Sequence, residues 1–145
     1  MTSADGCVYR GSWMHGLQHG EGTLKWPDGT EYHGQWHRGS RSGRGVLKSA
    51  GADPEYIYSG SFMNNSISGV GVMKWRNGNV YCGIMKNGKG QGKGKLSYGK
   101  TGDEYEGDFL NGNRHGQGKL RCNANGITFS GRFMGDNHEP SGLLQ

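Results

Sequence analysis

Four histidines near the amino terminus come nearest, by type and spacing, to a metal site. They are His15, His19, His33 and His37, and the last two would lie on one face of a strand because side chains alternate with a period of two. A zinc site needs three or four protein ligands of defined type. The sequence places no acidic or cysteine ligand at a matching spacing, so we predict no metal site.

The nearest approach to a phosphate-binding loop is the stretch KGQGKGK at residues 89–95. Such a loop requires the spacing GxxxxGK[ST] and a helix directly after it, and this stretch has neither. Glycine pairs with GxG spacing recur throughout the chain, which excludes a dinucleotide fingerprint. No Ser-His-Asp order repeats either. We therefore expect no catalytic residue, no cofactor and no enzymatic activity.

The composition narrows the class of protein further. The net charge of +5 is too small to indicate nucleic acid as a partner. No apolar run reaches transmembrane length, and no signal-type stretch follows Met1. Cys7, Cys82 and Cys122 are odd in number and lack CxxC spacing, which is typical of free thiols in a reducing compartment. We expect a soluble cytoplasmic protein.

The elements that position these side chains belong to one repeated unit. In the first copy, Tyr9 is followed by glycine at +2, tryptophan at +4, glycines at +7, +11 and +13, and leucine at +15. Further copies begin 23 to 26 residues apart, and such a period is typical of a repeat array. Thirty glycines would otherwise suggest disorder, but here they recur in register. The copies begin at Tyr9, Tyr32, Tyr58, Tyr81 and Tyr105, with a degraded sixth at Phe129.

The pattern YxGxWxxGxxxGxG, followed by a hydrophobic residue, a short turn and a glycine, resembles the MORN repeat (membrane occupation and recognition nexus). The resemblance covers residues 5–145 and implies a single array over residues 1–145. The third copy departs from the pattern at +7, where Asn65 replaces the glycine. MORN arrays are accessories in membrane tethers, plant lipid kinases, nucleotide exchange factors, ciliary radial spokes and protist cytoskeletons. The resemblance therefore implies a scaffold at the cytoskeleton, a cilium or a membrane surface, without identifying the host system.

Alternation predicts the secondary structure of each copy. Tyr9, Gly11 and Trp13 would share one face of a strand, and Pro27-Asp28-Gly29 is a strong turn signal. No segment has a helical period. We predict an all-β fold, an elongated single-layer antiparallel sheet of tandem β-hairpins. Glycine weakens a strand, but here it would let a neighbouring aromatic ring lie across the backbone.

The aromatic face of this sheet is the first candidate binding surface. One interpretation is a groove in which partly exposed rings anchor a partner, and the other is that the rings are already packed on the glycines. The candidate groove residues occupy the first and +4 positions of the five full copies: Tyr9, Trp13, Tyr32, Trp36, Tyr58, Phe62, Tyr81, Met85, Tyr105 and Phe109.

A stripe of basic residues on the polar face is the second candidate. It could bind anionic lipid headgroups or an acidic protein segment, and the alternative is an ordinary solvated face. Its members stand at +16 or nearby: Lys25, Lys48, Lys74, Lys93, Lys95, Lys119 and Arg121.

Together these features predict a non-catalytic scaffold that binds an extended or helical, acidic segment of another protein in the aromatic groove. The alternative is peripheral membrane tethering through phosphoinositide headgroups. The array also begins and ends partway through a repeat, so either its terminal strands are open edges that allow a homodimer or it belongs to a longer array.

Overall fold

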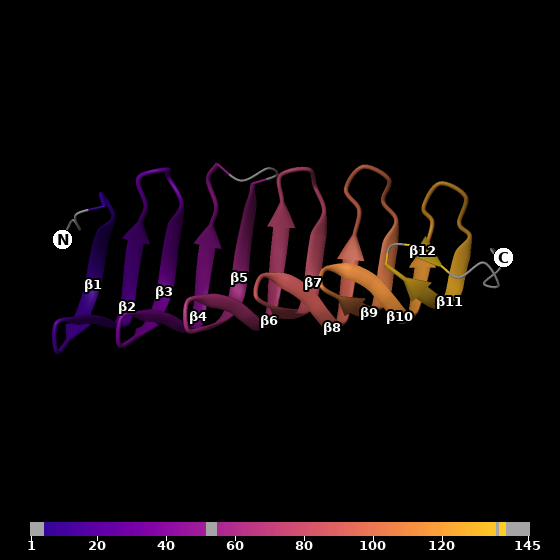
Figure 1. Cartoon of the computed structure of the whole chain (residues 1–145). Coiled ribbons are helices and arrows are strands. Elements are labelled where there is room, and N and C mark those ends of the chain that lie inside the picture. The colour runs from indigo at the N-terminus through magenta and orange to yellow at the C-terminus, as the bar shows by residue number, and fades with distance from the viewer. Residues whose placement is uncertain (1–4, 52–54, 136, 139–145) are drawn as a thin grey trace.

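The computed structural model describes residues 5–51, 55–135 and 137–138, and over these residues it contains strands and turns but no helix (Figure 1). Twelve strands form one antiparallel sheet in which each strand pairs only with its neighbours in sequence. This confirms the predicted all-β fold. Residues 139–145 of the predicted sixth copy lie outside the described residues. The strands are β1 (Val8–Met14), β2 (Leu17–Lys25), β3 (Glu31–His37), β4 (Ser40–Lys48), β5 (Tyr56–Met63), β6 (Ser66–Trp75), β7 (Val80–Lys86), β8 (Lys89–Ser97), β9 (Glu104–Leu110), β10 (Asn113–Arg121), β11 (Thr128–Met134) and β12 (Asn137–His138).

Each repeat contains a tight turn whose backbone is left-handed. Between β1 and β2, His15 and Gly16 have φ angles of 53° and 78°. Two consecutive positive φ angles are typical of a type I′ turn, whose twist matches that of the flanking strands. The third copy has Asn64 and Asn65 there, with φ angles of 47° and 71°. Asparagine tolerates this conformation better than most side chains, so Asn65 preserves the turn although it breaks the sequence pattern.

A row of glycines crosses the middle of the sheet, with opposed pairs such as Gly11 and Gly22. The first tyrosine of the repeat lies on this row, because a Cβ added at Gly22 would overlap the ring of Tyr9. The tyrosine hydroxyl donates a hydrogen bond to the main-chain oxygen three residues later, at 2.7 to 2.9 Å in all five full repeats. The predicted packing of rings on glycine is confirmed.

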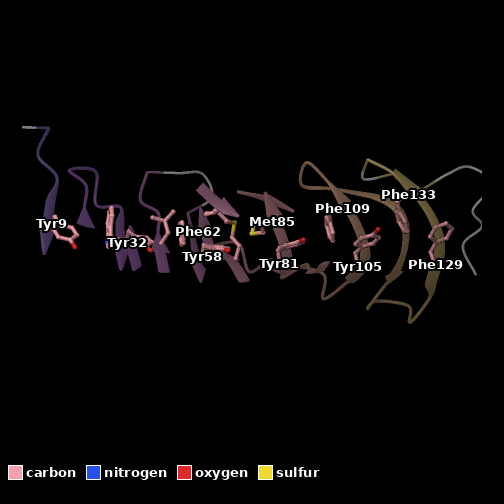
Figure 2. Packing of buried hydrophobic residues seen from close by; sticks show 14 residues of the cluster. Tyr9, Tyr32, Tyr58, Phe62, Tyr81, Met85, Tyr105, Phe109, Phe129 and Phe133 are labelled. Carbon is pink, nitrogen blue, oxygen red and sulfur yellow. The ribbon is translucent and has the colours of Figure 1, made fainter. Parts of the chain in front are cut away.

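The core is a chain of aromatic rings that runs along the array (Figure 2). The rings at +4 of the second, third and fifth repeats pack edge to face between the tyrosines of their own repeat and of the repeat before. Trp36, for example, lies 5.2 Å from Tyr32 and 5.4 Å from Tyr9 between ring centroids. Such pairs add about 0.5–1.5 kcal/mol beyond the burial of their area. Met85 stands at +4 in the fourth repeat and interrupts the chain of rings.

The sheet is bent rather than flat. The pairing within each repeat shifts register next to the glycine row, as between Gly11 and Trp13, and such β-bulges bend the strand. Figure 1 shows the tight turns along the lower edge running across the direction of the strands. We call the face with the first tyrosines the inner face and the face with Lys25 the outer face. The bend allows one layer to enclose a core on its inner face.

Candidate partner-binding surfaces

The predicted groove residues are packed inside the bend. Nine of the ten are no more than 5% exposed, and Trp13 alone is 44% exposed. The interpretation that the rings pack on glycine and on one another therefore holds for these nine, and the expectation of partial exposure is wrong for them. Trp13 differs because its ring contacts Tyr9 of its own repeat, and no described residue supplies the tyrosine of a repeat before it.

The accessible part of the inner face is a second row, which we call the accessible row. Its side chains pack against the core and remain partly exposed. They stand mainly at +15 and +17, just after the glycine pair of the same strand, and alternation along that strand predicts that these positions face inward. The accessible row comprises Leu24, Trp26, Tyr56, Trp75, Leu96, Tyr98 and Leu120.

Two hollows lie side by side on the inner face, and both are bounded by Gly88. The first, of about 380 Å³, is lined by Arg41, Tyr56 and Ile67 among others. The second, of about 190 Å³, lies beside Gly90 and its lining includes Trp75 of the accessible row. Both hollows are open to solvent. They give the inner face places where a partner's side chains could enter.

Two arginines at +9 also occupy this face, and sequence reasoning missed them. Arg41 stands opposite Trp36 in the register, and its guanidinium carbon lies 5.2 Å from the ring centroid of Trp26 and 5.8 Å from that of Tyr32. Burial lowers the pKa of Arg41. Arg114 stands opposite Phe109 in the fifth repeat and also lies over aromatic rings. The signal that would have found both is the register, which pairs +9 with the inward-facing +4.

The predicted basic stripe lies on the outer face. Strand pairing places Lys25, Lys48, Lys74 and Arg121 on one line across the sheet. The line is not uniformly basic, because residues of the intervening strands, such as Glu31, stand between the cations.

Four of the predicted stripe residues face carboxylates in the second half of the array. Lys93 lies 2.6 Å from Asp108, and its hydrogen bond lowers the pKa of that carboxyl. Glu104 contacts both Arg121, at 2.9 Å, and Lys95, at 3.7 Å. Lys119 stands opposite Glu106 in the register. These contacts weaken the attraction of that half for an external anion.

An apolar patch interrupts the outer face at the centre of the array, where the sequence predicted a polar surface. The side chains of Val46, Ile57, Val70 and Ile84 are 40–63% exposed. They come from four consecutive strands, β4 to β7. Aliphatic β-branched residues also favour strands for conformational reasons, so the patch has an explanation without a ligand.

The remaining candidates show no metal or membrane-spanning chemistry in the described residues. His19 and His37 lie with their ring centroids 5.0 Å apart, but no group of three or more potential ligands occurs in that part of the chain. Cys7, Cys82 and Cys122 are free cysteines. No helix of the described residues is long and apolar enough to cross a membrane. Strand β1 is paired on one side only and forms an open edge of the sheet.

The comparison with family models agrees with this geometry. The MORN repeat model matches residues 9–31, 32–51, 58–80, 81–101 and 105–126. The five matches begin at the five tyrosines that lie on the glycine row. A search of the curated proteins finds no match.

Proposed function

The chain belongs to the MORN-repeat family, and on this premise we propose that it is a non-catalytic scaffold that binds a segment of a partner protein along its inner face. MORN repeats suggest a protein- or membrane-interaction module. The choice between a protein and a membrane as partner rests on the accessible row, where partly exposed aromatic side chains recur from Trp26, directly after β2, to Tyr98, directly after β8. Tyrosine and tryptophan are the residues most often found as anchors in protein interfaces.

The dimensions of the inner face favour a long segment. Neighbouring strands lie about 4.8 Å apart, so eleven long strands span roughly 50 Å. A partner that follows the accessible row would cross the strands and meet a new anchor in each repeat. The length of the inner face supports a peptide segment as the ligand over a small molecule.

The outer face supports the lipid alternative less well. Lys25, Lys48 and Lys74 are exposed, but Lys93, Lys95 and Arg121 form ion pairs with carboxylates of the protein itself. Exposed lysines without a hydrophobic anchor bind membranes weakly and in a salt-dependent manner. Self-association through the open edge of β1 is compatible with the inner-face proposal, because edge pairing leaves the accessible row uncovered. The three free cysteines support a reducing, cytoplasmic location.

The test of the proposal compares two neighbouring residues that face opposite ways. Peptides of about twelve residues, long enough to cross most of the strands when extended, are selected from a random displayed library on the immobilised protein. Trp75→Ala should weaken the selected peptides by at least about 30-fold, as expected of an interface hot spot. Lys74→Ala, on the outer face, should leave their affinity unchanged. Circular dichroism checks that both variants are folded.

A second measurement addresses the membrane. Vesicles containing phosphoinositide should not sediment the protein at physiological salt. Tight sedimentation that is lost when Lys25, Lys48 and Lys74 are changed together to glutamate would replace our proposal with the lipid alternative. If the selected peptides bind Trp75→Ala and the unmodified protein with equal affinity, the inner face is not the binding surface.

A further inference from the structure

We propose that the segment bound along the inner face is acidic and extended, with two defined anchors. A carboxylate of the partner pairs with Arg41, and a bulky apolar side chain about six residues away enters the hollow beside Gly90. This inference rests on the proposed function, because it identifies the chemistry of the ligand for the same surface.

The first anchor is a cation held among aromatic rings. The guanidinium of Arg41 lies over Trp26 and Tyr32, and its Nη2 donates a hydrogen bond to the main-chain oxygen of Asn65 at 3.0 Å. Within the described residues, its Nε is buried without a hydrogen-bond partner and no carboxylate lies within ion-pair distance. A partly buried charge without a counterion is costly. A bound carboxylate would offset that cost.

Carboxylate is the anion that this geometry favours in a protein partner. A guanidinium presents a planar fork of donors that matches the two oxygens of a carboxylate. The rings restrict the plane of the fork, and Arg41 is one of the residues that line the larger hollow. The aromatic contacts therefore orient the cation before the ligand arrives.

The second anchor is a place where the array lacks a side chain. The +9 residue stands opposite +4 in each repeat, and it is Gln18, Arg41, Ile67 and Arg114 in the other full copies. In the fourth copy it is Gly90, opposite Met85. The φ angle of Gly90 is not in the left-handed region, but a Cβ there would lie 3.0 Å from the ring of Tyr81.

An apolar hollow lies beside Gly90. Trp75, Met85, Leu96 and Phe109 line it, and its volume is about 190 Å³. This is enough for a large part of a leucine or phenylalanine side chain to leave water, which favours binding. The hollow therefore selects a bulky apolar residue.

The spacing of the anchors follows from the strand order. Arg41 lies on β4 and Gly90 on β8, so four strand spacings of about 4.8 Å separate them by roughly 19 Å. An extended chain advances about 3.3 Å per residue, which places the two anchor side chains about six residues apart. The two hollows share Gly88, so the path between the anchors is continuous.

The experiment tests both anchors by measuring which residues are enriched in the sequences of the selected peptides. On the unmodified protein, the selection described above should enrich aspartate or glutamate together with a bulky apolar residue about six positions away. Selection on Arg41→Gln should lose the acidic preference and keep the apolar one. Selection on Gly90→Ile should lose the apolar preference and keep the acidic one. If the new Cβ, 3.0 Å from the ring of Tyr81, costs this variant its strand signal in circular dichroism, Leu96→Phe replaces it, because Leu96 also lines the hollow. Lys48→Gln removes the same charge from the outer face and should change neither.

The outcomes separate the inference from the proposed function. Unchanged preferences on both variants, with binding still dependent on Trp75, would overturn the two anchors and leave the inner-face proposal standing. Failure to select any peptide that depends on Trp75 would overturn both. If Arg41→Gln loses its strand signal in circular dichroism, Arg41→Lys replaces it. That variant keeps the charge but lacks the planar fork, so its acidic enrichment should fall at least severalfold, and undiminished enrichment counts against the carboxylate pair.

Discussion

Alkaline pH should unfold this array through its tyrosines. Burial raises the pKa of Tyr32, Tyr81 and Tyr105 from about 10 to about 12. Below pH 10 these hydroxyls are protonated in both the folded and the unfolded chain, so they contribute no pH dependence. Between pH 10 and 12 the unfolded chain releases its protons first, and stability falls as pH rises through this window.

The size of this loss of stability follows from the pKa shifts of the three tyrosines. One pKa unit corresponds to about 1.4 kcal/mol, so a shift of two units lowers the free energy of unfolding by about 2.7 kcal/mol per tyrosine. Three such residues give about 8 kcal/mol, which is comparable to the whole stability of a small domain. We therefore expect the array to unfold before all of its tyrosines can ionise in the folded state.

Two spectra recorded together test this expectation. Tyrosinate absorbance and the far-ultraviolet circular dichroism of the strands should change in the same pH interval, because the buried hydroxyls ionise on unfolding. The chain in concentrated denaturant, titrated alongside, should ionise near the ordinary tyrosine pKa. Replacing Tyr32 with phenylalanine should reduce the alkaline loss by about 2.7 kcal/mol, since one of the groups with a raised pKa is removed. Complete ionisation near pH 10 with an unchanged strand spectrum would refute the reasoning.

Two further substitutions examine the glycine row and the outer face. Gly45→Ala should lower the free energy of unfolding by at least about 1–3 kcal/mol, because the new Cβ would overlap the ring of Tyr32. Gly131→Ala should cost less in the same urea titration, since its Cβ would lie 3.3 Å from the ring of Phe129; equal losses would contradict the role given to the ring. Glu104→Gln should lower the melting temperature slightly at low salt, and the difference should vanish at high salt because exposed ion pairs are screened. A loss that persists at high salt would point to another role for Glu104.

The fold was predictable from the sequence because its determinants are local. The tyrosine, the glycine pair and the tight turn of each repeat lie within one hairpin. Their spacing therefore determines where the two strands lie and in which register they pair. The packing of Tyr9 on Gly22 follows from the same spacing, because both lie on one face of paired strands. The structure adds that the hydroxyl of each such tyrosine is bonded to the main chain.

The exposure of the candidate site was not predictable in the same way. Alternation places Trp13 and Trp36 at equal positions, but Trp36 is buried between the tyrosines of two repeats, whereas Trp13 packs on the tyrosine of its own repeat. Neither the bend nor the contact with the preceding repeat is visible in a period-two pattern. Arg41 and Gly90 were missed for the same reason, because their neighbours come from adjacent repeats.

The strand order from β1 to β12 has a consequence for how the chain folds. Every strand finds its partners within the adjoining hairpins, so each pairing closes a short loop and costs little chain entropy. Folding rates rise when contacts are local in sequence. The amino-terminal hairpins can therefore form while the ribosome is still adding the later repeats, and each new hairpin extends a template that already exists. The newest edge strand is exposed at every stage of synthesis, so the growing chain presents a pairing surface to its neighbours on the same messenger RNA until the next hairpin covers it.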